Sequence, residues 1–142
     1  MWLFRTVEDG LPPIILHKYT ETRARFNAEK FLEGFKGYLE TDGYQGYNDL
    51  PGIKRCCCFA HLRRYFVEAV PKGKELDYSN PAAQAVQYCN RLFAYERIFQ
   101  EKVHSFEERK EYRFQKEKPV LDAFWTWISQ QTPKKGHGWR KR

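Results

Sequence analysis

The sequence lacks the features that would place it in a membrane or outside the cell. No apolar run approaches the ~20 residues that a membrane-spanning helix requires, and 30% of the residues are charged. The mean hydropathy is -0.78. No basic stretch followed by an apolar one occurs at the amino terminus, so no secretion signal is indicated. We therefore expect a soluble protein of the cytoplasm.

The chain has four cysteines, and their spacing excludes the usual cysteine-based sites. Three of the four cysteines are consecutive, at Cys56, Cys57 and Cys58. Neighbouring residues on a strand point to opposite faces, so these three thiols cannot all face one metal ion or readily pair with one another. Neither a disulfide framework nor a zinc ribbon fits this pattern.

What the chain does have is enough length for a core, many aromatic residues and an excess of positive charge. A chain of 142 residues suits a single domain. The net charge of +7 makes an acidic partner plausible, and nucleic acid is the commonest one. Five of the basic residues lie in the last nine positions, 134–142, and these could instead form a solvated tail.

The first half of the chain alternates strand and helix patterns. Strands are expected over residues 2–7 and 14–19, which form a hairpin, and over 38–41 and 53–60, the last of them buried; helices are expected over 23–35 and 61–70. This order predicts an α/β or α+β fold with flanking helices for residues 1–71.

The second half reads as helical. A polar loop over 72–78 precedes a long helix that Ser79 or Asn80 caps with Pro81 at its first position. A charged helix is expected over 106–118, and a separate one begins at Pro119 with an apolar face of Leu121, Phe124, Trp125 and Ile128. We therefore divide the chain into residues 1–71, a helical insertion over 72–131, and a disordered basic tail over 132–142.

Asp42 is the first candidate for a functional side chain. The strand over 38–41 stops at Asp42-Gly43, and loops at strand ends hold side chains clear of the packed sheet. The alternative is that Asp42 only caps a turn through local hydrogen bonds. Glu40 and Asp49 are weaker candidates. Glu40 would share a strand face with Asp42 only if the strand continued through Asp42, but a turn begins there, and Asp49 itself suits a turn.

A second group lies where the strand over 53–60 gives way to a helix. His61, Arg63 and Arg64 open this helix, and the simplest interpretation is a capping histidine with two solvated arginines. The spacing of Cys58 and His61 also permits a cysteine nucleophile with a histidine base. That alternative is weak, because an apolar strand leaves thiols inert.

Several motifs together resemble one known family. They are Asp42-Gly43-Tyr44, Gly46-Tyr47 and Cys58-Phe59-Ala60-His61-Leu62-Arg63-Arg64-Tyr65-Phe66, supported by residues 9–14, 35–39 and 117–124. This combination resembles the catalytic domain of bacterial transposases of the insertion sequence 66 family, over nearly the whole chain to about Pro133. The tail over 134–142 does not look like family sequence, and a frameshift or premature stop would account for it.

The resemblance implies an incomplete ribonuclease-H-like mixed sheet and a triad of acidic residues that hold two divalent ions, normally Mg²⁺. Asp42 matches the second acid, both catalytic and metal-binding, whereas the strand with the first acid and the motif with the third are absent from the sequence. His61, Arg63 and Arg64 would border the cleft and contact DNA phosphate.

The prediction is therefore a truncated transposase core that is inactive alone, does not hold Mg²⁺ tightly, and acts on element ends and target DNA in the bacterial cytoplasm at the nucleoid. Whether it is an enzyme stays open. The alternative is a non-catalytic nucleic-acid-binding or regulatory fragment that pairs with full-length transposase.

Overall fold

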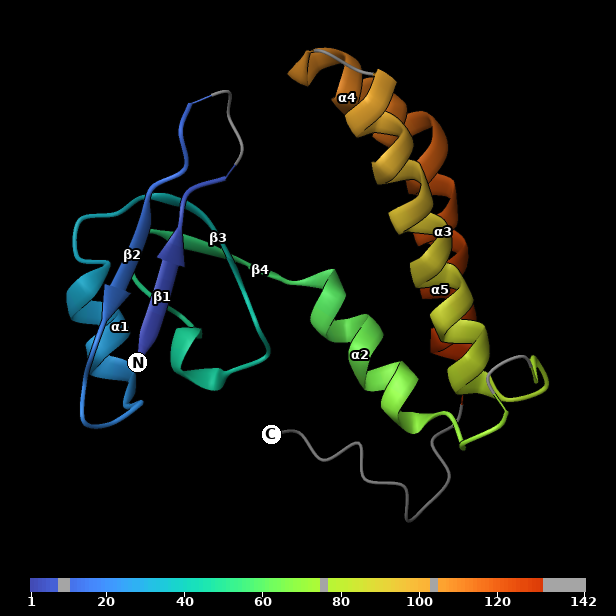
Figure 1. Cartoon of the computed structure of the whole chain (residues 1–142), viewed down its shortest axis with the longest axis horizontal. Helices are drawn as coiled ribbons and strands as arrows, with labels where there is room; N and C mark the ends of the chain where they lie inside the picture. Colours follow the sequence, from blue (N-terminus) through green and yellow to red (C-terminus); the bar gives the residue numbers. More distant parts are fainter. Residues whose placement is uncertain (8–10, 75–76, 103–104, 132–142) are drawn as a thin grey trace. The chain divides into compact units, whose positions relative to one another are not determined.

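The computed structural model describes residues 1–7, 11–74, 77–102 and 105–131 (Figure 1). The chain folds into two compact units: a strand unit of residues 1–58 and a helical unit from Phe59 onward. Each unit is described by itself below. The domain boundary that the sequence predicts at residue 71 stays a prediction, and the tail over 132–142 lies outside the described residues.

The strand unit contains two small sheets. β1 (Trp2–Arg5) pairs antiparallel with β2 (Ile15–Lys18), so the predicted hairpin is confirmed. β3 (Gly37–Thr41) pairs parallel with β4 (Ile53–Cys57), with Thr41 opposite Cys57. The mixed α/β class is confirmed. In the described part of the chain, however, the four strands form two separate two-stranded sheets instead of one mixed sheet.

One α-helix and a short 3₁₀ turn complete the strand unit. α1 (Arg25–Phe31) is shorter than the predicted helix over 23–35, because Ala24 is extended and Gly34 has a φ of +80° that ends the run. η1 (Gln45–Tyr47) is a single short turn that contains Gly46. The buried apolar side chains of this unit are Trp2, Ala28 and Leu50, and the ring of Phe4 stacks on Phe31 at 4.0 Å between centroids.

The prediction that the fourth strand is buried is wrong. β4 forms where the sequence indicates a strand, but Cys56 and Cys57 are exposed and Cys58 is half-buried. Among the described residues β4 pairs with β3 alone in a two-stranded sheet, and the thiols of Cys56 and Cys57 stay open to solvent. A buried parallel strand needs cover on both faces.

The helical unit consists of α2 (Phe59–Ala69), α3 (Pro81–Lys102), α4 (Phe106–Tyr112), the π-helical turn η2 (Arg113–Glu117) and α5 (Lys118–Gln130). The predicted cap of α3 is confirmed, since Oδ1 of Asn80 accepts the Ala82 N–H at 2.8 Å. Ser105 caps α4 by accepting the Glu108 N–H at 3.1 Å. α3 packs against α2 and α5 (Figure 1), around a core of Phe66, Ala85, Cys89 and Phe124.

Two details of the last helix differ from the sequence prediction. Pro119 does not start a new helix, because η2 joins α4 to α5 without a break and the Lys118 N–H donates to the Arg113 carbonyl five residues back. Pro119 can follow a π turn because proline has no N–H to donate, so the change in hydrogen-bond pattern there costs it no bond. Trp125 was expected on the apolar face but is 55% exposed. Trp127 packs against the core in its place.

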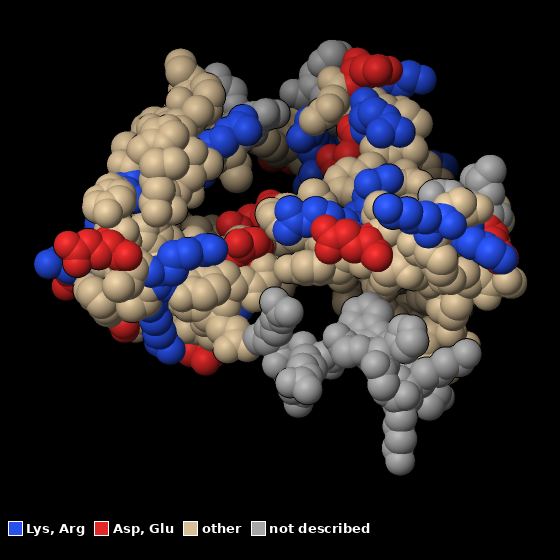
Figure 2. Space-filling model, turned by 60° about the horizontal axis from the view of Figure 1, so that its bottom comes forward, with Lys and Arg blue, Asp and Glu red and all other residues tan. Residues whose placement is uncertain are grey.

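The surface shown in Figure 2 carries Lys and Arg side chains with Asp and Glu among them, so the excess positive charge is not segregated on that face. None of the helices that the structure describes is long and apolar enough to cross a membrane.

Candidate functional site

Asp42 lies directly after β3, at the carboxyl ends of the parallel strands β3 and β4. The Cys58 N–H donates to the Thr41 carbonyl at 2.8 Å, so the two chains stay paired up to this point. The side chain of Asp42 is 34% exposed. A half-exposed carboxylate at the carboxyl end of parallel strands is where α/β folds place groups that meet a ligand.

The Asp42 side chain also forms the local turn that the sequence offered as the alternative. Its Oδ1 accepts the Tyr44 N–H at 3.0 Å, which is an Asx turn. Its Oδ2 lies 3.8 Å from Nη2 of Arg23, in an ion pair whose arginine is 59% exposed. One carboxylate oxygen of Asp42 therefore forms the turn, while the other pairs with the exposed side chain of Arg23.

Arg55 on β4 fixes the backbone at Asp42, and sequence reasoning missed it. Its Nη2 donates to the Asp42 carbonyl at 2.8 Å, and its Nε donates to Oγ1 of Thr41 at 2.9 Å. Its Nη1 donates to Oδ1 of Asn48. The sequence feature that could have indicated this role is a charged side chain in a strand predicted to be buried. In the parallel register Arg55 lies directly opposite Leu39. One side chain thus ties the end of β3 to the loop that follows.

Aromatic rings form the wall beside Asp42. The ring centroids of Trp2 and Tyr47 lie 5.7 Å apart, those of Tyr44 and Tyr47 lie 5.9 Å apart, and the Arg23 guanidinium lies 4.6 Å from the Tyr44 ring. Burial raises the pKa of Tyr47, and the nearby Asp42 carboxylate raises it further. Tyr47 therefore keeps its proton at neutral pH, and its ring packs between those of Trp2 and Tyr44.

The residues present do not by themselves form a site for two divalent ions. Among the residues that the structure describes, no group of three or more His, Cys, Asp or Glu side chains could hold a metal ion. Glu40 is exposed, and Asp49 has a φ of 50° within a turn, as its sequence context indicates. Mg²⁺ prefers several oxygen ligands in octahedral geometry, and a single carboxylate offers too few of them.

His61, Arg63 and Arg64 all lie in the first half of α2, in the helical unit. Nε of Arg63 donates to Oδ1 of Asn90 at 2.7 Å, and Nε of Arg64 lies 3.7 Å from Oε1 of Glu68. Nδ1 of His61 is buried and has no hydrogen-bond partner among the described residues, so that atom neither accepts a hydrogen bond from a thiol nor accepts one from a backbone N–H at the helix start. Asp42 belongs to the strand unit, so a cleft shared by all four residues stays a prediction.

The family described as "Transposase IS66 family" matches residues 1–139. The chain therefore belongs to the IS66 family of transposases. This match corrects the expectation that the tail departs from family sequence for residues 134–139, which lie within the matched range.

Among curated proteins, the chain is similar to two from Sinorhizobium fredii (strain NBRC 101917 / NGR234). It is 29% identical to "Uncharacterized protein y4jD" over 119 residues, which cover 78% of this chain and 22% of that protein. It is 29% identical to "Uncharacterized protein y4hP" over 137 residues, which cover 84% of this chain and 24% of that protein. The chain thus spans about a quarter or less of the length of these relatives. No solved structure matches.

Proposed function

We propose that this chain forms part of a ribonuclease-H-like catalytic domain of a DNA transposase, in which Asp42 is one of the acidic ligands of the divalent ions, normally Mg²⁺. The observation that carries the proposal is the position of Asp42 at the carboxyl ends of β3 and β4, with its backbone held by Arg55. Membership of the IS66 transposase family supports it.

The strand pairing supports the fold that this proposal requires. Within the described residues, β1 pairs only with β2, and β3 pairs only with β4. A parallel pair alone is an unusual sheet, because parallel strands are normally covered and joined to further strands. We propose that a further strand of the transposase joins β1 to β3 in one mixed sheet and brings the first acid beside Asp42.

The chain alone is then inactive in strand cleavage. Two ions about 3.5–4 Å apart need several carboxylates to bridge them, and phosphoryl transfer needs both ions to stabilise the attacking and leaving oxygens. Asp42 supplies one carboxylate, and the described residues contain no group that completes the set. In a complete site, Arg55 and the Asx turn would keep that carboxylate in place, and Arg23 would have to swing away from it.

The test is strand transfer by the longer polypeptide, built by joining this chain to the flanking portions of a relative such as y4hP. With element-end DNA and Mg²⁺, we expect Asp42→Asn to abolish strand transfer while DNA binding is retained. Asp49→Asn is the matched control, because it makes the same chemical change in a turn where asparagine accepts the positive φ. Equal activity of Asp42→Asn and the parent protein would refute the proposal.

A second candidate function is that of a nucleic-acid-binding or regulatory fragment that pairs with full-length transposase. The net charge of +7 favours it, and so does the shortage of metal ligands among the described residues. Salt-sensitive binding of DNA by this chain that Asp42→Asn leaves unchanged, together with inhibition of a full-length transposase in mixed reactions, would favour this function over catalysis.

A further inference from the structure

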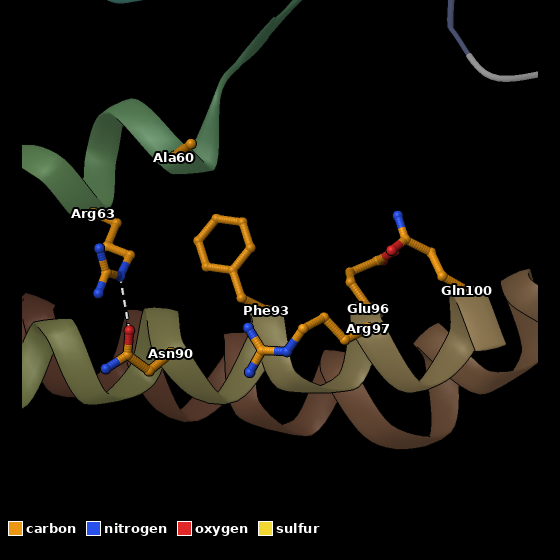
Figure 3. A pocket seen from close by; sticks show the side chains of 7 residues that line it. All are labelled: Ala60, Arg63, Asn90, Phe93, Glu96, Arg97 and Gln100. Atoms are coloured by element: carbon orange, nitrogen blue, oxygen red, sulfur yellow. Dashed lines mark hydrogen bonds between the residues drawn. The ribbon is translucent and has the colours of Figure 1, made fainter.

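A polar groove lies between α2 and α3, within the helical unit. It has a volume of about 560 Å³ and is lined by Ala60, Arg63, Asn90, Phe93, Glu96, Arg97 and Gln100 (Figure 3). Five of these residues come from one face of α3, and the other two come from the first turns of α2. Pockets that bind small ligands have volumes in this range.

The groove presents positive charge that is not neutralised locally. Arg63 donates to the amide oxygen of Asn90, which carries no charge (Figure 3). Arg97 is exposed and has no carboxylate partner among the described residues. The one acid in the lining, Glu96, is already paired, because its Oε1 accepts Nε–H of Arg113 at 2.6 Å. Two arginines are therefore left to receive an anion.

An aromatic ring and two amides lie between these charges. The Phe93 ring stands in the groove between the Arg63 end and the Glu96 end, and Asn90 and Gln100 flank it along α3 (Figure 3). Phosphate groups suit arginine, bases stack on aromatic faces, and amide side chains can donate to and accept from base edges. This is the chemistry that recognises a nucleotide chain with unpaired bases.

We propose that this groove binds a short segment of single-stranded DNA, with phosphates on Arg63 and Arg97 and a base stacked on Phe93. A double helix does not offer an unpaired base face, and the groove is too small to admit one. The inference rests on the proposed DNA-handling role of the chain. It is independent of Asp42, which lies in the other unit, and it assigns a contact site for unpaired DNA to the helical unit.

The experiment measures binding of a fluorescent oligothymidine and of a duplex of equal length to the whole chain, by anisotropy at low salt without divalent metal. We expect the single strand to bind more tightly than the duplex. Arg97→Ala should weaken single-strand binding about five- to tenfold and reduce the slope of log affinity against log salt by about 0.7. Phe93→Leu should weaken it about fivefold or more while retaining an apolar contact with the core.

Arg91→Ala is the matched control, because Arg91 is an exposed arginine of the same helix that does not line the groove. Equal losses for Arg91→Ala and Arg97→Ala would overturn the proposal, since they would show binding by net charge alone. Duplex binding as tight as single-strand binding would overturn it as well. Circular dichroism checks that each variant is folded. If Phe93→Leu does not fold, the comparison of Arg97→Ala with Arg91→Ala tests the proposal, because both of these arginines are exposed. The catalytic proposal is tested by strand transfer with Asp42→Asn, and the groove proposal is tested by binding of single-stranded DNA. Either proposal can therefore fail without the other.

Discussion

Arg55 holds Asp42 by its main chain and not by its carboxylate: Nη2 of Arg55 lies 2.8 Å from the Asp42 carbonyl oxygen. The hydroxyl of Thr41 donates to the same carbonyl at 2.8 Å. The arginine thereby orients the backbone of the acid without neutralising its side chain. The carboxylate charge is left to the more exposed Arg23, which a ligand can displace.

The first prediction compares these two arginines. Arg55→Ala removes three hydrogen bonds, one of them to the buried Thr41, and should lower the free energy of unfolding by about 1.5–3 kcal/mol. Arg23→Ala removes one exposed ion pair and the contact of the guanidinium with the Tyr44 ring, and should cost about 1 kcal/mol. Urea unfolding of both variants measures the difference. Equal effects would mean that Arg55 does not fix the loop after β3.

The second prediction concerns Glu117, the buried acid of the π turn. Burial, together with the neighbouring Glu96 carboxylate, raises its pKa to about 7. The folded protein thus holds a proton on Glu117 that the unfolded chain releases near 4.5. Stability from this group is fully present below the unfolded value and is lost as pH rises through about 7.

Urea unfolding at about pH 5 and about pH 8 tests this, and we expect a loss on the order of 1–3 kcal/mol between the two. Glu117→Gln should remove most of that loss, because a neutral amide needs no proton. Glu111→Gln is the matched control, since Glu111 is an exposed acid of the preceding helix. If Glu117→Gln keeps the whole pH dependence, another group is responsible.

The third prediction uses two neighbouring residues of α5. Phe124 is fully buried and its ring lies close to those of Phe66 and Tyr88, with centroids 6.1 and 5.2 Å away. Phe124→Ala should cost about 3–5 kcal/mol of unfolding free energy. Trp125 is 55% exposed, so Trp125→Ala should cost less than about 1 kcal/mol. Thermal or urea unfolding compares the two, and similar costs would contradict the core assignment.

Local patterns predicted most elements of this fold, because turns and caps are decided within a few residues. The hairpin, the cap of α3 by Asn80 and the turn at Asp49 all follow from short-range chemistry. The burial of β4 could not be predicted in the same way, since it depends on which other strands and helices cover it. The sequence also could not show which of Trp125 and Trp127 packs against the core, because that depends on the neighbouring helices.

In the candidate site, too, local patterns predicted some features, while others depend on contacts between distant residues. The strand break at Asp42-Gly43 located the acid, and its Asx turn was among the alternatives. The role of Arg55 depends on the parallel register of β3 and β4, which no local pattern fixes. The groove between α2 and α3 brings together residues about 30 positions apart, and helical periodicity alone gives only the face of each helix.

The last prediction concerns the four cysteines. Cys56 and Cys57 are exposed, whereas Cys89 is fully buried and burial raises its pKa to about 11. Relative to a thiol at 9.0, Cys89 carries about a hundredfold less thiolate near neutral pH, and it is also shielded from reagents. Brief treatment of the folded protein with iodoacetamide should therefore modify Cys56 and Cys57 and spare Cys89.

Trypsin separates the two groups, because cleavage after Arg55 and Arg63 releases Cys56 to Cys58 in one peptide, and cleavage after Lys74 and Arg91 releases Cys89 in another. Mass spectrometry of the two peptides then reports the modified fraction of each, with urea-unfolded protein as the control in which all four thiols react. Modification of Cys89 as fast as that of the exposed pair would show that the helices around this core open readily, because the folded helical unit buries that thiol completely.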